Sequence, residues 1–101
     1  MFKNIKEYII CSAIYFNDGI IHHHQPFNIN VGFVIGGHRH HNCFMTAYIL
    51  NNNKKIIVDS EIQGFLTNTN TFVDRKDAAI IAFNAGQILK PIQKLFSEDI
   101  Y

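Results

Sequence analysis

The chain contains only two arginines, and each stands where a loop is expected to lead into a helix. Arg39 is followed by His40 and His41 ahead of a helical pattern, and Arg75 follows Asp74 ahead of another. Free N–H groups at a helix N-terminus attract anions, and an arginine beside them can bind two phosphate oxygens at once. The sequence therefore predicts a binding site for a phosphorylated small molecule at Arg39 and Arg75.

Two phenylalanines flank a polar loop near the second of these junctions. Phe65 and Phe72 stand on either side of residues 67–71, and their ring faces would suit the stacking of a nucleotide base. A structural interpretation is equally open. In it the phenylalanines lie in the core, and an arginine pairs with Asp74 or Asp77 instead of a ligand.

Patterns for catalysis are weak. There is no Gly-x-Ser-x-Gly motif, Ser97 stands in an ordinary turn context, and the adjacent Glu98 and Asp99 are more typical of a solvated tail than of an acid–base pair. His40 and Cys43 are three residues apart and would share a helix face, so a reactive thiol pair is the alternative to a buried cysteine. We expect no enzyme.

Six histidines raise the question of a metal. Along a strand His22, His23 and His24 would alternate in direction, so at most two of them converge. They could meet the histidines of 38–41 across two elements, but the spacing lacks the cysteine or acidic partners typical of zinc. We expect neither a metal nor a cofactor, with a solvated strand end as the simpler interpretation and a small histidine-based metalloenzyme as the alternative.

The composition favours one small domain spanning 1–101. Thirteen aromatic residues, nine Phe and four Tyr, are many for this length and favour burial between subunits. The net charge of +1 argues against general binding of DNA, RNA or an acidic membrane. No apolar run approaches the roughly 18 residues of a membrane span, and no secretory signal is recognisable. Cys11 and Cys43 lie in apolar runs, so we expect free, buried thiols in an intracellular protein.

The first third of the chain reads as extended structure. Residues 6–16 are rich in β-branched and aromatic residues and predict a strand. The turn signal at 17–19, Asn-Asp-Gly, predicts a hairpin in which a second strand restarts at 20–21. Residues 27–35 are compatible with a short strand or an extended loop, and the glycines at 36–37 are expected to break the chain.

A helix is expected over 40–50. Its apolar residues share one face at helical spacing: Phe44, Met45, Tyr48 and Ile49. The asparagines at 51–53 supply a stop. Residues 54–59 and 61–66 then predict one or two strands, and 67–71 a polar loop without packing anchors.

A second helix is expected from Asp74, which can cap its first turn with help from Asp77. Small side chains form a stripe along one face: Ala78, Ala82, Ala85 and Leu89. Such a stripe allows close approach, so the helix should pack against a sheet or a second chain. Pro91 should end it by about Lys90. The tail at 95–101 reads as a docking segment, because Phe96, Ile100 and Tyr101 need burial.

Four blocks of the chain resemble the ordered motifs of a phage protein family. They are Gln63-Gly-Phe-Leu-Thr67, Phe72-Val-Asp-Arg-x-x-Ala78, Ala85-Gly-Gln-Ile88 and Leu95-Phe-Ser-Glu-Asp-Ile-Tyr101, with Arg39-His40-His41 as an upstream arginine–histidine motif. The family is that of the Thoeris anti-defence proteins, Tad1-like sponges for cyclic ADP-ribose signals. Residues 68–71, without the glycine-containing turn, and the histidines at 22–24 depart from its pattern.

The resemblance implies an α+β fold with an N-terminal antiparallel β-sheet and C-terminal helices that pack in a dimer interface, with dimers building hexamers. It implies a non-enzymatic protein of the host cytoplasm that sequesters a cyclic nucleotide immune signal, either glyco-cyclic ADP-ribose isomers or cyclic oligonucleotides. By the same resemblance Arg39 and Arg75 contact phosphates, and Phe65 and Thr67 form pocket walls. The full candidate set is Arg39, His40, His41, Phe65, Thr67, Asn68, Phe72 and Arg75. The third alternative is a phage structural or interaction module without a ligand.

Overall fold

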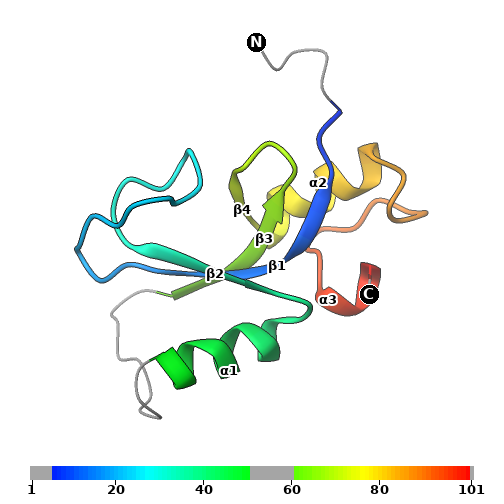
Figure 1. The fold of residues 1–101 in the computed structure, drawn as a ribbon. Coiled ribbons are helices and arrows are strands. Elements are labelled where there is room, and N and C mark those ends of the chain that lie inside the picture. Colours follow the sequence, from blue (N-terminus) through cyan, green and yellow to red (C-terminus); the bar gives the residue numbers. More distant parts are fainter. Residues whose placement is uncertain (1–5, 51–60, 101) are drawn as a thin grey trace.

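The computed structural model describes residues 6–50 and 61–100 and contains a four-stranded antiparallel sheet with helices packed on it (Figure 1). The strands are β1 (Ile9–Phe16), β2 (Phe33–Gly37), β3 (Glu61–Thr67) and β4 (Phe72–Asp74), in the order β2-β1-β3-β4. The helices are α1 (His40–Leu50), α2 (Arg75–Asn84) and the short α3 (Ser97–Ile100). The α+β prediction is confirmed, although the sheet also draws two strands from the second half of the chain.

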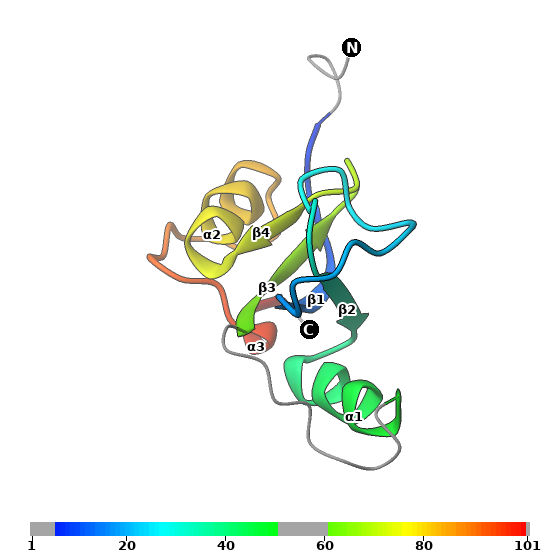
Figure 2. The ribbon, with the colours of Figure 1, turned by 90° about the vertical axis from the view of Figure 1, so that its left-hand side faces the viewer.

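One face of the sheet carries both helices. Ser12 lies opposite Phe65 in the register, so both side chains share a face, and a bulge after Ile9 brings that residue to the same side. α1 packs over β1 and β2, and α2 packs over β3 and β4 (Figure 2). Two apolar clusters result. One contains Ile9, Phe65, Ala78, Ala79, Ala82 and Leu95, and the other contains Ile14, Phe16, Ile35, Cys43 and Ala47.

The alanine stripe of α2 packs against the sheet of its own chain. Ala78 and Ala82 are fully buried in the cluster that contains Phe65 and Leu95. Because alanine lacks a long side chain, the helix axis can approach the strands closely. The sequence left open whether the stripe packs against a sheet or against a second chain. In the structure it packs against the sheet.

The ends of α2 show why the predicted helix was too long. Asp74 caps the N-terminus as predicted, since its Oδ1 accepts from the Asp77 backbone N–H at 2.8 Å. The helix ends at Asn84 rather than Lys90, because Gly86 takes a positive φ of 77° and the next N–H returns to the carbonyl of Ala82. Leu89 therefore lies outside the helix and is 96% exposed.

The N-terminal strand is confirmed over Ile9–Phe16, but the hairpin prediction is wrong. The turn at 17–19 forms, with Gly19 at a φ of 77°, yet its antiparallel partner β2 begins only at Phe33. Ile21 makes only an isolated bridge to Gly32. Pro26 interrupts the intervening segment, which cannot pair continuously with β1.

The two glycines at 36–37 do not break the chain; they complete β2. At Gly37 a Cβ would lie 3.2 Å from the Cys43 sulfur and 3.3 Å from its backbone nitrogen. Glycine therefore lets the first turn of α1 settle directly over the end of β2. The helix at 40–50 and the strand at 61–66 are confirmed, while the predictions for 51–53 and 54–59 lie outside the described residues. Within the described ranges, no helix is long and apolar enough to cross a membrane.

The threonine-rich loop is anchored, contrary to prediction. The Glu7 carboxylate accepts from the hydroxyls of Thr67, Thr69 and Thr71 at 2.9, 2.7 and 3.2 Å. These bonds outweigh the effect of partial burial and lower the pKa of Glu7. The Asn68 side chain adds a bond from the Tyr8 N–H at 2.7 Å. The loop thus ties the segment before β1 to the end of β3.

The C-terminal segment docks mainly through Leu95 and Ser97, which are both buried. Ile100 packs against the cluster under α2, as the docking prediction requires. The predicted burial of Phe96 is wrong: this residue is 46% exposed, because its ring lies on the partly exposed guanidinium of Arg75 and not in the core. Tyr101 lies outside the described residues.

Candidate functional site

The first residues of α1 and α2 meet over the sheet. His40 begins α1, Arg75 begins α2, and Arg75 Nη2 lies 3.5 Å from His40 Nδ1. The side chains of the two helices' first residues therefore meet at one place. This contact joins the arginine–histidine motif to the Phe-Val-Asp-Arg motif, which stands 35 residues later in the chain.

His40 is held as a neutral ring at this junction. Its Nε2 donates to the Gly64 carbonyl at 2.8 Å, so Nδ1 is left to accept from the Ser97 hydroxyl at 2.7 Å. The edge of the ring contacts Phe65, with 5.1 Å between centroids. Burial lowers the pKa of His40, and the nearby charge of Arg75 lowers it further. With a proton on Nδ1, the Ser97 hydroxyl would have to accept from the ring instead of donating to it.

Arg75 binds the C-terminal segment to the sheet. Its Nη1 donates to the Leu95 carbonyl at 2.8 Å, and its Nη2 donates to Gln63 Oε1 at 2.6 Å. The guanidinium lies 4.5 Å from the centroid of the Phe96 ring. Within the described residues no hydrogen bond or ion pair joins Arg75 to Asp74 or Asp77. The structural alternative for this arginine is therefore a clamp on the tail rather than an aspartate pair.

Two serines complete a buried polar network. The hydroxyls of Ser12 and Ser97 lie 2.9 Å apart, and Ser12 also reaches the His38 carbonyl at 3.2 Å. Neither Ser12 nor Gln63 was predicted as a site residue, and Ser97 was expected in an ordinary turn. The available signal was Ser12 itself, since a hydroxyl inside an apolar strand must find a hydrogen-bond partner.

Cys43 is buried under the start of α1 and is not paired with His40. Its thiol reaches the carbonyls of Arg39 and Ser12 at 3.5 and 3.6 Å. Burial raises the pKa of Cys43 to about 11, so the thiol stays protonated at neutral pH. Cys11 is also free, as predicted, although it is only partly buried.

The structure gathers some of the predicted site residues and separates others. Arg39 is half-exposed beside the junction, and His41 is exposed on the first turn of α1. Phe65 is fully buried beneath His40, so neither ring face is open in this chain. Phe72 is buried and faces Tyr15, with ring centroids 6.0 Å apart.

Thr67 and Asn68 lie apart from the junction. They follow Gly64, the partner of His40, by three and four residues along β3, which places them about 10 Å or more away. Their side chains anchor residues 6–8 instead. The gathered set is therefore Arg39, His40, His41, Phe65 and Arg75, and the separated set is Thr67, Asn68 and Phe72.

The triple histidine has ordinary surface surroundings. His22 Nε2 lies 2.8 Å from Asp18 Oδ2, and its ring meets the Phe33 ring edge-on at 5.2 Å. His24 takes a left-handed φ of 61° in the loop before β2. In the described portion of the chain, no three His, Cys, Asp or Glu side chains are grouped closely enough to hold a metal ion.

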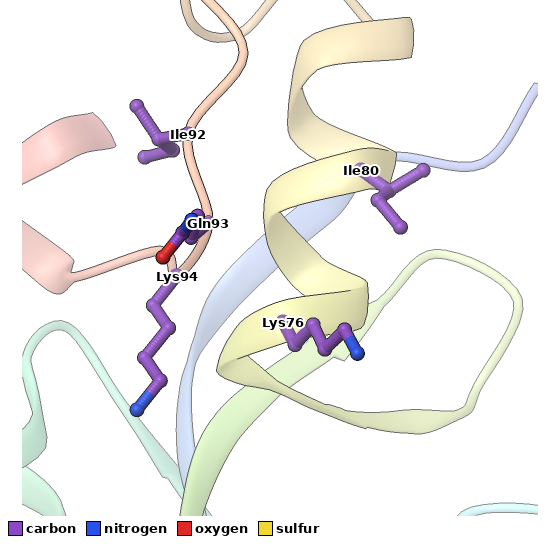
Figure 3. A pocket seen from close by; sticks show the side chains of 5 residues that line it. All are labelled: Lys76, Ile80, Ile92, Gln93 and Lys94. Atoms are coloured by element: carbon purple, nitrogen blue, oxygen red, sulfur yellow. The ribbon is translucent and has the colours of Figure 1, made fainter.

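A surface hollow of about 460 Å3 lies beside α2 (Figure 3). Lys76 and Ile80 project from the helix, and Ile92, Gln93 and Lys94 line the other side from the segment before α3. Neither lysine forms an ion pair within the described residues. The backbone links the two walls of the hollow to Arg75, because Lys76 follows Arg75 and Lys94 precedes Leu95, whose N–H donates to the Arg75 carbonyl at 2.9 Å. The sequence did not single out these lysines.

The buried His40 predicts a loss of stability in mild acid. Its folded pKa lies below the ordinary value of 6.5, so below about pH 6.5 the unfolded chain takes up the proton first. The stability that the neutral ring contributes is present above that pH and is lost as the pH falls toward the folded pKa. The unfolding free-energy difference between the protein and a His40→Gln variant should therefore shrink from pH 7.5 to pH 5. An NMR titration of His40 with a midpoint at or above 6.5 would contradict this.

A family model described as Phage T4 y16D protein matches residues 8–101. The chain belongs to this phage protein family. The match covers the whole sheet, all three helices and the junction of His40 and Arg75. No curated protein and no solved structure matches the chain. The family places the protein among phage proteins.

Proposed function

We propose that this phage protein is a non-enzymatic sponge that binds and sequesters a cyclic nucleotide immune signal in the host cytoplasm. The ligand is of the cyclic ADP-ribose type, with cyclic oligonucleotides as the related class. The protein acts as a homodimer that can build a hexamer. The proposal rests on the junction of α1 and α2 and on the hollow beside it.

The observation that carries the proposal is that residues from separate motifs meet at one junction. Gln63 contacts Arg75, and Gly64 contacts His40. Ser97 bonds to His40, while Phe96 lies against the Arg75 guanidinium. These contacts connect positions up to 57 residues apart. Such convergence is what a binding site assembled from distant segments requires.

Arg75 retains capacity for a ligand. A guanidinium carries five N–H donors, and that of Arg75 makes three contacts, to Leu95, Gln63 and His40. Two N–H groups therefore have no protein partner within the described residues. The side chain is partly exposed, so an anion can approach it. The remaining donors are the Nε–H and one Nη1–H, which point to different sides of the guanidinium, so each can donate a single charge-assisted hydrogen bond to an anion.

The neighbouring hollow offers further apolar and cationic groups that would fit a nucleotide. Its volume of about 460 Å3 lies within the range of small-molecule sites. Ile80 and Ile92 provide apolar walls for a base or ribose, and Lys76 and Lys94 provide cations for a pyrophosphate. A cyclic dinucleotide-like molecule combines these same two chemistries.

Binding without cleavage fits the state of the nearest nucleophile. Ser97 and His40 are arranged like a nucleophile and a base, but Ser97 is 2% exposed and His40 is 8% exposed. A substrate would have to displace the C-terminal segment to reach the hydroxyl. Arg75 and Leu95 hold that segment in place.

The test uses the two lysines, because their loss should not disturb the fold. The Lys76→Ala/Lys94→Ala variant should bind a cyclic ADP-ribose isomer about ten- to a hundredfold more weakly, since charge-assisted contacts contribute about 1.5–3 kcal/mol each before solvent screening. Calorimetry with the parent protein identifies the ligand from a panel of cyclic ADP-ribose isomers and cyclic oligonucleotides. Heat denaturation of the loaded protein should release that ligand intact.

Lys90→Ala is the matched control, because Lys90 is an exposed lysine that does not line the hollow. It should bind as the parent does, and all three proteins should melt together. Equal affinity of the double variant and the control would remove the hollow from the site. Recovery of a hydrolysed ligand would overturn the non-enzymatic assignment.

A further inference from the structure

The helix α1 has two apolar faces, and the fold uses only one. His40, Cys43 and Ala47 point to the sheet and are buried. On the far side, at helical spacing i, i+3, i+4, i+7 and i+8, stand His41, Phe44, Met45, Tyr48 and Ile49. Phe44, Met45, Tyr48 and Ile49 remain 38, 56, 45 and 63% exposed. These four apolar residues are the ones whose spacing predicted the helix.

We name these four apolar side chains the outer face of α1. A helix that is apolar on both sides is normally covered on both sides, because exposed apolar area of this extent is unfavourable in water. Figure 2 shows α1 at the margin of the molecule, with the sheet and α2 on one side of it only. Within the described residues nothing covers its outer face.

The absence of charge on α1 points to a second copy of the chain as the partner. None of the 11 residues of the helix is Asp, Glu, Lys or Arg. A two-fold contact brings each group near the axis against its own copy, so a charge there would meet a like charge. The outer face avoids this repulsion and offers no charged group for a partner of opposite sign.

The area agrees with what a dimer requires. The exposed fractions of the four side chains amount to about two complete side chains, or roughly 400 Å2 at about 200 Å2 each. Two copies then contribute roughly 800 Å2 of apolar area. Since homodimer interfaces are about 65% apolar, the total is roughly 1,200 Å2, the lower end for a specific interface.

We propose that the outer face of α1 forms a two-fold homodimer interface in which the two α1 helices pack antiparallel. Antiparallel packing sets the positive end of each helix beside the negative end of its partner. Met45 stands midway between His41 and Ile49, so the axis passes close to it. This interface is separate from the alanine stripe of α2, and it holds whether or not the protein binds a nucleotide.

The interface also borders the candidate ligand site. His41 lies on the same side of α1 as the outer face, and Arg39 and His40 precede it directly in the chain. A partner helix would therefore cover the side of α1 next to the junction. Ligand-binding residues of the two copies would lie at opposite ends of the helix pair.

The decisive experiment is oxidative cross-linking through single cysteines on α1. Met45→Cys should form a disulfide-linked dimer within minutes under mild oxidation, because the two substituted positions lie within the roughly 4.4–6.8 Å between Cα atoms that a disulfide spans. Thr46→Cys is the matched control: it is an exposed neighbour on the same helix that points away from the outer face. It and the parent, with native Cys11 and Cys43, should stay monomeric on a denaturing gel. Equal cross-linking of both variants would overturn the assignment.

A second measurement does not depend on oxidation. In analytical ultracentrifugation at micromolar concentration, the parent should have a molar mass twice that of the 11.6 kDa chain. Met45→Lys/Ile49→Lys should weaken the dimer at least a hundredfold while leaving the circular dichroism of the protomer unchanged. Ile21→Lys/Leu89→Lys changes two exposed apolar residues that lie outside both α1 and the hollow, and it should leave the dimer intact. A parent that sediments as a monomer at 100 µM would overturn the proposal, whatever the ligand-binding result.

Discussion

Replacing Gly64 with alanine should remove a large part of the protein's stability. An added Cβ would collide with the Val73 carbonyl and lie 2.7 Å from Phe72 Cζ, so β3 and β4 could not keep their spacing. The colliding atom is backbone, which cannot move aside as a long side chain can. The same shift would move the Gly64 carbonyl from His40. We expect a loss of at least about 3–4 kcal/mol, against a total of roughly 5–15 kcal/mol for a domain of this size.

Urea denaturation followed by circular dichroism measures this loss. Gly36→Ala provides the comparison, because its added Cβ would be crowded by the ends of the Cys11 and Leu66 side chains, at 3.2 Å, while the Ser12 carbonyl at 3.8 Å is at an ordinary contact distance. Those side chains can shift by a few tenths of an ångström, so the expected cost is about 1 kcal/mol. Similar midpoints for Gly64→Ala and the parent would show that the β3–β4 contact is looser than described.

Phe65→Ala should give the second large effect, a loss of about 3–5 kcal/mol in the free energy of unfolding. The ring is fully buried among Ala78, Ala82 and Leu95, and it supports the edge of His40. Its removal would leave a cavity beneath both helices. Phe65→Leu fills most of that cavity and should recover more than half of the loss.

This prediction separates a core residue from a pocket wall. If Phe65 lined an open pocket, Phe65→Ala would weaken ligand binding and leave the unfolding midpoint nearly unchanged. We expect instead that Phe65→Ala mainly lowers the free energy of unfolding. Phe83→Ala, which truncates a partly exposed phenylalanine of α2, should lose less than half as much. Equal losses at the two positions would contradict the assignment of Phe65 to the core.

The sequence by itself determined the elements whose signals are local. Apolar spacing located α1 at its observed bounds, His40–Leu50, because helical periodicity is written into neighbouring residues. The Asp74 cap is equally local, since the side chain bonds an amide three residues away. The strand at β1 followed from a run of β-branched and aromatic residues. The α+β class and the two arginine junctions rest on these same signals.

Local signals failed where a competing local signal or a distant partner decided the outcome. Gly86 ended α2 before Pro91 could, because its positive φ completes the helix cap. The turn at Gly19 did not make a hairpin, since pairing with β1 was taken by β2 and β3. Glu7 organised the threonine loop from 60 residues away. No window of neighbouring residues contains such an interaction.

Only the tertiary structure decided what each face and each polar group does. The alanine stripe could serve a sheet or another chain, and the sheet took it because β3 and β4 lie beneath α2. The apolar residues whose spacing predicted α1 point away from the sheet. The small residues Cys43 and Ala47 face the sheet instead, because they allow the helix to approach the strands more closely than Phe44 or Tyr48 would. At the junction, His40 contacts Arg75 and Ser97, which lie 35 and 57 residues away from it in the sequence. Side chains so far apart in sequence meet only when the whole sheet has formed.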